Sequence, residues 1–187
     1  MNEFELIQQL RIGDEHAFKF LVETYQDMVF NTALGIVQNT EDAEDVAQEV
    51  FIKVFRSIDT FKGESKLSTW IYRITTSCAL DLVRGKKSKK RFAFLQRLFG
   101  DGNEPLHEVP DFYHPGVVMD QKENAARLFK AINKLPESQK VAFTLHKLES
   151  LSYQEIGEVM QTSVSAVESL MHRAKQNLRK MLEKEAG

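Results

Sequence analysis

The sequence predicts an all-α protein with two small helical domains, an extended acidic linker between them and a helix-turn-helix in the C-terminal domain. Apolar residues recur at intervals of three and four over most of the 187 residues, the spacing of amphipathic helices. Strand alternation of useful length, internal repeats and a glycine-rich phosphate loop are missing from the sequence. Three of the four prolines fall between residues 98 and 120. We therefore expect domains at 1–91 and 121–187, joined by a linker at 92–120.

The composition is that of a globular cytoplasmic protein. The formal charge of -2 excludes a uniformly basic nucleic-acid coat, so any such contact must come from local patches. A single cysteine, Cys78, excludes an internal disulfide framework. No apolar run approaches the roughly 20 residues that cross a bilayer, and the N-terminus lacks the features of a signal peptide. We expect no stable membrane insertion.

Three helices are predicted before residue 60. Apolar residues from Phe4 to Ile36 keep helical spacing, and Gly13-Asp14 marks a turn that divides them into two helices. A third helix begins near Thr40, because acidic residues crowd its first turns, where the helix dipole favours negative charge. Its outer face is acidic with one aliphatic residue. That face consists of Asp45, Gln48, Glu49 and Ile52. A solvated face and a protein interface fit it equally well.

A loop from Phe61 leads into a fourth helix that we expect from about Ser68 to Arg84. Trp70 and Cys78 fall on the side of this helix that can pack against a core. Tyr72 falls on another side. Aromatic rings beside Lys and Arg near a flexible loop suit single-stranded nucleic acid, because bases stack on rings while cations follow the backbone. Tryptophan and tyrosine are more often core residues, so both interpretations stay open.

The charge changes sign along the expected linker. Residues 84–97 hold seven basic and no acidic residues, whereas residues 98–120 hold five acidic residues and no lysine or arginine. The basic part could continue the preceding helix and contact phosphates. The acidic part is either inert or occupies a basic channel that otherwise holds nucleic acid.

The second domain is predicted to end in two helices that are joined by a short turn. One amphipathic helix precedes Leu135, and Pro136 opens another that runs to about Leu148. Ser152 and Glu155 then form a capping box at the start of a further helix. The polar run 161–163 ends it. The last helix turns Val167 and Met171 toward the core, and it leaves small polar residues followed by basic ones outside. Such a face fits a DNA major groove, and an ordinary helical hairpin explains the pattern equally well.

Catalysis and bound cofactors are not expected. The five histidines have no neighbours at metal-ligand spacing. The closest cluster, His107, Asp111 and His114, lies in the proline-containing linker, where a rigid set of ligands is improbable.

Two sets of motifs resemble the extracytoplasmic-function sigma factors. Residues 42–55, 61–65 and 68–74 resemble the promoter-melting domain of that family, and residues 135–139, 151–157 and 166–175 are similar to its upstream-element domain. The resemblance covers nearly the whole chain except the linker. It implies a bacterial subunit that directs core RNA polymerase to the minus-thirty-five and minus-ten elements of promoter DNA, melts the DNA and initiates transcription. It also implies an inhibitory anti-sigma factor as a partner.

The resemblance assigns roles to three surfaces. The polymerase clamp helices would bind Asp45, Gln48, Glu49 and Ile52. A base flipped from the minus-ten strand would enter a pocket beside the loop 62–69, and the contacts to this strand would come from Lys53, Ser57, Phe61, Lys62, Ser65, Lys66, Trp70, Tyr72, Arg73, Ser77 and Arg84. Bases of the minus-thirty-five element would face Ser165, Ala166, Glu168, Ser169 and His172, with Arg173, Lys175 and Arg179 nearer the phosphates. The acidic linker would thread the polymerase channel later used by RNA.

The chain departs from the family pattern at two positions. Ser77 stands where the family usually has asparagine, which puts a direct amide contact to a minus-ten base in doubt. Glu168 stands where a basic residue is frequent, and its carboxylate either accepts a hydrogen bond from cytosine or closes a capping box with Ser165. We favour Ser163 as the cap of the last helix, with Glu168 outward.

Two other classes of function remain possible from the residues. A two-domain transcription regulator would bind duplex DNA unaided through the same helix pair. A pure interaction adaptor would show neither DNA contact nor promoter-dependent transcription. The acidic face on the third helix distinguishes a sigma factor from these two classes, because only a sigma factor needs such a face to bind polymerase.

Overall fold

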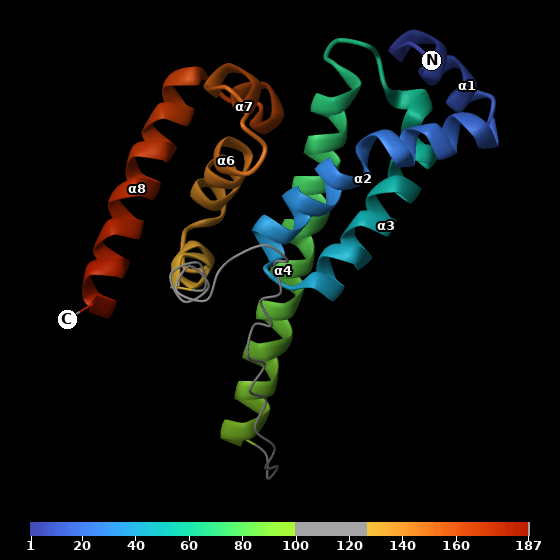
Figure 1. Cartoon of the computed structure of the whole chain (residues 1–187). Coiled ribbons are helices and arrows are strands. Elements are labelled where there is room, and N and C mark those ends of the chain that lie inside the picture. The colour runs from blue at the N-terminus through green and yellow to red at the C-terminus, as the bar shows by residue number, and fades with distance from the viewer. Residues whose placement is uncertain (100–126, 187) are drawn as a thin grey trace, which may run out of the picture.

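A computed structural model describes residues 1–99 and 127–186, and all regular elements of this part are helical (Figure 1). The predicted all-α class is confirmed. The first part holds α1 (Glu3–Arg11), α2 (Glu15–Val37), α3 (Thr40–Ser57), the short 3-10 helix η1 (Ile58–Thr60) and α4 (Leu67–Phe99). The second part holds a helical stretch at 127–133, then α6 (Glu137–Lys147), α7 (Tyr153–Met160) and α8 (Val164–Ala186). Side chains are described for residues 1–89 and 127–184.

Side-chain caps fix where the first three helices begin. Asn2 and Glu5 form a capping box on α1. The Ala17 amide donates to Asp14 Oδ1 at 2.7 Å, and the Asp42 amide donates to Asn39 Oδ1 at 2.9 Å. Each bond satisfies an amide that has no partner inside its helix. The expected turn at Gly13-Asp14 and the helix start near Thr40 are both confirmed.

The fourth helix is longer than the sequence analysis expects. It begins at Leu67 and continues to Phe99, through the whole basic segment. That segment contains no proline and a single glycine, Gly85, so nothing in it interrupts a helix. The helix therefore includes residues 92–99, which the sequence analysis places in the linker. The remaining part of that linker, residues 100–120, lies outside the described residues.

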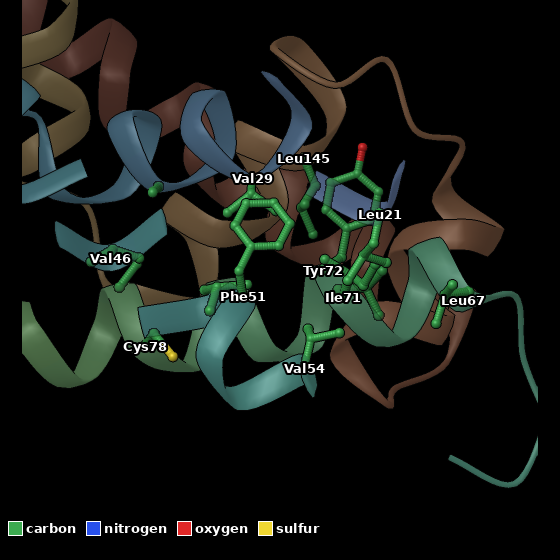
Figure 2. Packing of buried hydrophobic residues seen from close by; sticks show 14 of the residues in the cluster. Leu21, Val29, Val46, Phe51, Val54, Leu67, Ile71, Tyr72, Cys78 and Leu145 are labelled. Carbon is green, nitrogen blue, oxygen red and sulfur yellow. The ribbon is translucent and has the colours of Figure 1, made fainter. Parts of the chain in front are cut away.

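The main core lies between α2, α3 and α4, and the second domain contributes to it. Figure 2 shows Leu145 of α6 among side chains of the first domain, near Val29 and Leu21. All three are fully buried. Helix α6 contacts α2, and α7 contacts α4. The two predicted domains therefore pack directly against each other.

A smaller core holds the second domain together. It joins the stretch 127–133 and Leu135, two residues beyond it, to the inner face of α8. Its buried members are Ala131, Ile132, Leu135, Ala174 and Leu178. This contact supports α8 from behind and leaves the opposite face of the helix open.

One lysine of α6 is buried. Lys140 is 2% exposed, and its Nζ donates to Asn133 Oδ1 at 2.9 Å. Burial lowers the pKa of this amine from its ordinary 10.5 to about 8, and the charge of Lys87 adds to that effect. Between these two values the unfolded chain holds the proton and the folded chain does not. The free energy of unfolding due to Lys140 therefore rises with pH across this window.

We expect Lys140→Met to remove this pH-dependent contribution. The variant should be more stable relative to the parent at pH 7.5 than at pH 10, because only the parent gains stability as its amine deprotonates. Urea unfolding at the two pH values measures the difference. The exposed Lys130 provides the control, since Lys130→Met should leave the pH dependence of the parent intact. An identical pH slope in Lys140→Met and the parent would contradict a lowered pKa.

Candidate nucleic-acid interface

A tight turn joins α7 to α8. The Ser152 and Glu155 capping box begins α7 as the sequence predicts. Gln161 ends it in the left-handed conformation, with a φ of 53°. The Thr162 amide then donates to the Gly157 carbonyl at 2.9 Å. A β-carbon on Gly157 would lie only 2.9 Å from the Thr162 carbonyl oxygen, so the turn requires glycine at this position.

Ser163 caps α8, as the sequence analysis favours. The Ala166 amide donates to Ser163 Oγ at 3.1 Å, and the helix begins at Val164. Ser165 instead accepts a hydrogen bond at its carbonyl from Ser169 Oγ, at 3.0 Å. Glu168 therefore has no capping role to perform and lies exposed.

The residues assigned to the minus-thirty-five element share the outer face of α8. Ala166 is half-buried, and the other seven are exposed. Glu168, Ser169, His172 and Arg173 line a shallow depression on this face. Arg173 Nε donates to the Ser169 carbonyl at 3.1 Å, which sets the guanidinium along the helix. The arrangement presents short polar groups first and basic groups further along, as groove contacts and phosphate contacts require.

The residues assigned to polymerase lie together on α3. Asp45, Gln48, Glu49 and Ile52 are all exposed, and Ile52 exposes 49% of its surface. Glu49 pairs with Lys53 Nζ at 2.7 Å. Phe55 is also exposed beside Ile52, although the sequence analysis did not single it out. The helical spacing of three between these two apolar residues was the signal that would have found it.

The residues assigned to the minus-ten strand differ in their exposure. Lys53, Lys62, Lys66, Ser77 and Arg84 are exposed, and Ser57, Ser65, Trp70 and Arg73 are half-buried. Phe61 and Tyr72 are buried, at 4% and 7% exposure. The Phe61 ring packs against the Trp70 ring with centroids 5.2 Å apart. In this structure Trp70 is thus the aromatic ring of the loop region that solvent reaches, and Phe61 supports it from within.

Four of these minus-ten residues also contact the second domain. Tyr72 Oη donates to Glu149 Oε2 at 2.9 Å. Arg73 donates twice to the Glu158 carbonyl, at 2.8 and 3.2 Å. Arg84 pairs with Glu137 at 2.8 Å, and Lys66 lies 3.8 Å from Glu155. The sequence analysis did not anticipate the contacts of Glu137, Glu149 and Glu158, because no local pattern signals a partner so far along the chain.

Comparison with known proteins identifies the family. Sigma-70 region 2 matches residues 21–89, and Sigma-70, region 4 matches residues 125–178. The RNA polymerase sigma-H factor of Pseudomonas aeruginosa is 34% identical over 182 residues, which cover 96% of this chain and 93% of that protein. The ECF RNA polymerase sigma factor SigW of Bacillus subtilis is 33% identical and covers 94% of each chain. This chain belongs to the extracytoplasmic-function sigma factors.

The fold of this sigma factor agrees with that membership. It resembles the solved structure of the sigma factor RpoE in complex with the anti-sigma factor NepR from Bartonella quintana, with a TM-score of 0.60 and 22% identity over 89% of this chain and 96% of that one. A sigma factor binds core RNA polymerase and initiates transcription at promoters, so the leading hypothesis is confirmed over a lone DNA-binding regulator and an adaptor.

The described residues contain neither a metal cluster nor a membrane helix. No three His, Cys, Asp or Glu side chains within residues 1–89 and 127–184 come together as metal ligands. None of the described helices is long and apolar enough to cross a membrane. The cluster of His107, Asp111 and His114 lies outside the described residues.

Proposed function

We propose that this sigma factor recognises the minus-thirty-five element through the outer face of α8. The proposal rests on one observation: Ser165, Glu168, Ser169, His172 and Arg173 are all exposed on α8. The turn that leads into this helix requires Gly157. Small polar groups near the start of the helix contact base edges, and Ala166 contributes apolar surface to the same region. Arg173, Lys175 and Arg179 bind phosphates and set the register.

The first domain binds polymerase and the minus-ten strand through two different helices. The exposed face of α3 with Ile52 docks on the polymerase clamp helices. The loop 62–66 and the start of α4 capture the displaced strand, with Trp70 as the stacking ring and the lysines on the backbone. Ser77, which is exposed, supplies one hydroxyl where the family pattern has an amide.

The protein carries out no covalent chemistry of its own in this scheme and works in the cytoplasm beside the polymerase. The solved relative RpoE binds an anti-sigma factor, and we extend that kind of partner to this chain. The predicted domains at 1–91 and 121–187 are the units that polymerase and promoter would engage.

Arg173→Ala is expected to weaken promoter binding by the polymerase holoenzyme across all sequences. Loss of one phosphate contact should lower the slope of log affinity against log salt by about one. Binding titrations at several salt concentrations, with Lys184→Ala as the control at the far end of α8, provide the measurement. A loss confined to one base position would instead make Arg173 a base-contacting residue.

Glu168→Gln is expected to change the preferred base at one position of the minus-thirty-five element. A carboxylate accepts hydrogen bonds only, whereas an amide both accepts and donates, so preference should shift away from cytosine. Selection of promoters from a randomised library with each holoenzyme measures the preference. Unchanged preference would mean that Glu168 does not contact a base.

A further inference from the structure

We propose that α1 supports the loop 62–66 from behind, and that Glu3 and Arg11 are positioning residues for the capture of a minus-ten base. This inference rests on the proposed capture of the displaced strand by that loop. Figure 1 shows α1 beside the end of the α3 and α4 pair where the chain passes from η1 to α4. Helix α1 also contacts η1. Neither Glu3 nor Arg11 belongs to the surface that we assign to DNA.

Two hydrogen bonds join α1 to the two ends of this loop. Arg11 Nη2 donates to the Phe61 carbonyl at 2.8 Å, just before the loop. The Leu67 amide donates to Glu3 Oε1 at 3.2 Å, just after the loop. The two pairs are 50 and 64 residues apart in the sequence. One short helix therefore holds both points at which the loop leaves the rest of the domain.

The positions of Glu3 and Arg11 on α1 suit this role. They stand near the two ends of the helix, which runs from Glu3 to Arg11, and are about 12 Å apart along its axis at about 1.5 Å for each residue. Around the axis they differ by about 80°, at about 100° for each residue, so both side chains can reach the same neighbour. A single rigid element thus fixes the separation between the two ends of the loop.

Glu3 also supplies a cap that the start of α4 lacks. Leu67 is the first residue of α4, so its amide has no acceptor within the helix. Lys66, which precedes it, has no side-chain oxygen to accept this bond, and the first turn of α4 contains no acidic residue. The carboxylate of Glu3 provides both the acceptor and the negative charge. Position 66 can therefore hold a lysine, whose charge suits the DNA backbone.

The helix is well fixed, whereas the loop has little support of its own. Leu6 and Leu10 of α1 are 3% and 2% exposed, and the capping box of Asn2 and Glu5 begins the helix. In the loop, residues 62–64 and 66 are all exposed. A loop with so few contacts loses much conformational freedom when it closes on a ligand. Fixing its two ends beforehand reduces that loss and favours binding of the base.

Removing both bonds with Glu3→Ala and Arg11→Ala tests the proposal. The probe is the single non-template strand of the minus-ten element, from a promoter that the unmodified holoenzyme selects from fragmented genomic DNA. A series of strands lacks one base at a time, and the missing base that most weakens binding by the unmodified holoenzyme marks the captured position. The double variant should bind the intact strand at least fivefold more weakly. It should bind the strand without the captured base as the unmodified holoenzyme does.

Conservative variants separate positioning from a general effect on the fold. Glu3→Gln keeps an oxygen acceptor and Arg11→Lys keeps a donor, so each should recover part of the binding that its alanine variant loses. Hydrogen exchange at the Leu67 amide should be faster in Glu3→Ala, because its acceptor is lost. Gln8 is exposed on the same helix, and Gln8→Ala should bind both strands as the unmodified protein does. Each single alanine variant provides the same comparison if the double variant folds poorly.

Three results would contradict the account in different ways. Equal weakening on the intact strand and on the strand without the captured base would overturn the proposal, because the two residues would then act through the fold or through recruitment. Unchanged binding of the intact strand would overturn it as well. If no missing base weakened binding by the unmodified holoenzyme, the proposed capture of a base would itself fail.

Discussion

Replacing Ile52 by Asp is expected to weaken the binding of core RNA polymerase by about thirtyfold, or about 2 kcal/mol. Ile52 is an apolar side chain on an acidic face, and half of its surface is exposed in the free protein. A few residues that become fully buried near the centre of an interface supply most of its binding energy. A buried carboxylate at the same point would add a desolvation cost. Fluorescence titration of labelled sigma factor with core enzyme measures the change.

A matched control separates this effect from damage to the fold. Ile12 is an equally apolar residue, is 76% exposed and lies just after α1, on a different element from the α3 face. Ile12→Asp should leave polymerase binding unchanged. If both variants lost binding to the same extent, or if Ile52→Asp bound normally, the α3 face would not be the docking surface.

Trp70→Ala is expected to reduce promoter opening by at least tenfold while polymerase recruitment to promoter DNA stays unchanged. Stacking of one base on an aromatic ring contributes about 1–3 kcal/mol, and Trp70 is the half-exposed ring above the buried Phe61. Permanganate reactivity reports opening, and gel mobility of the complex before melting reports recruitment.

Trp70→Phe is the control for the ring itself. It keeps an aromatic face against Phe61 and should recover a large part of the opening. Phe61→Ala should instead lower the free energy of unfolding by about 3–5 kcal/mol, as for other buried phenylalanines. Loss of recruitment together with loss of stability in Trp70→Ala would show that Trp70 acts in the fold alone.

Local features of the fold could be predicted from the sequence because they depend on neighbouring residues. The capping box of Ser152 and Glu155 and the cap at Ser163 use atoms three positions apart, so the spacing alone identifies them. The start of α3 was predictable for a different local reason, the acidic residues of its first turn, which the helix dipole favours. Helical spacing of apolar residues predicted which of them are buried less reliably than it predicted the helices themselves. Phe4 shares the apolar spacing of its helix yet is 72% exposed, because no element covers that side of α1 in the described structure.

The sequence predicts which residues form the candidate surfaces, but it does not predict how the two domains pack over them. Exposure of Ile52 on α3 and of Arg173 on α8 agrees with the expected surfaces. The burial of Tyr72 beside Glu149 was not foreseeable, since the pair depends on how two domains pack. The sequence does not decide whether α4 extends to Phe99, because a run of lysines by itself predicts neither a helix nor a loop.

Reconstitution with core RNA polymerase tests the central claim most directly. Purified protein and core enzyme should together initiate transcripts at discrete sites on genomic DNA, whereas the protein alone should bind the same DNA weakly, given its net charge of -2. Run-off transcription and binding titrations give both quantities in one experiment. Tight, specific binding to duplex DNA by the protein alone, with no association with polymerase, would contradict its role as a sigma factor.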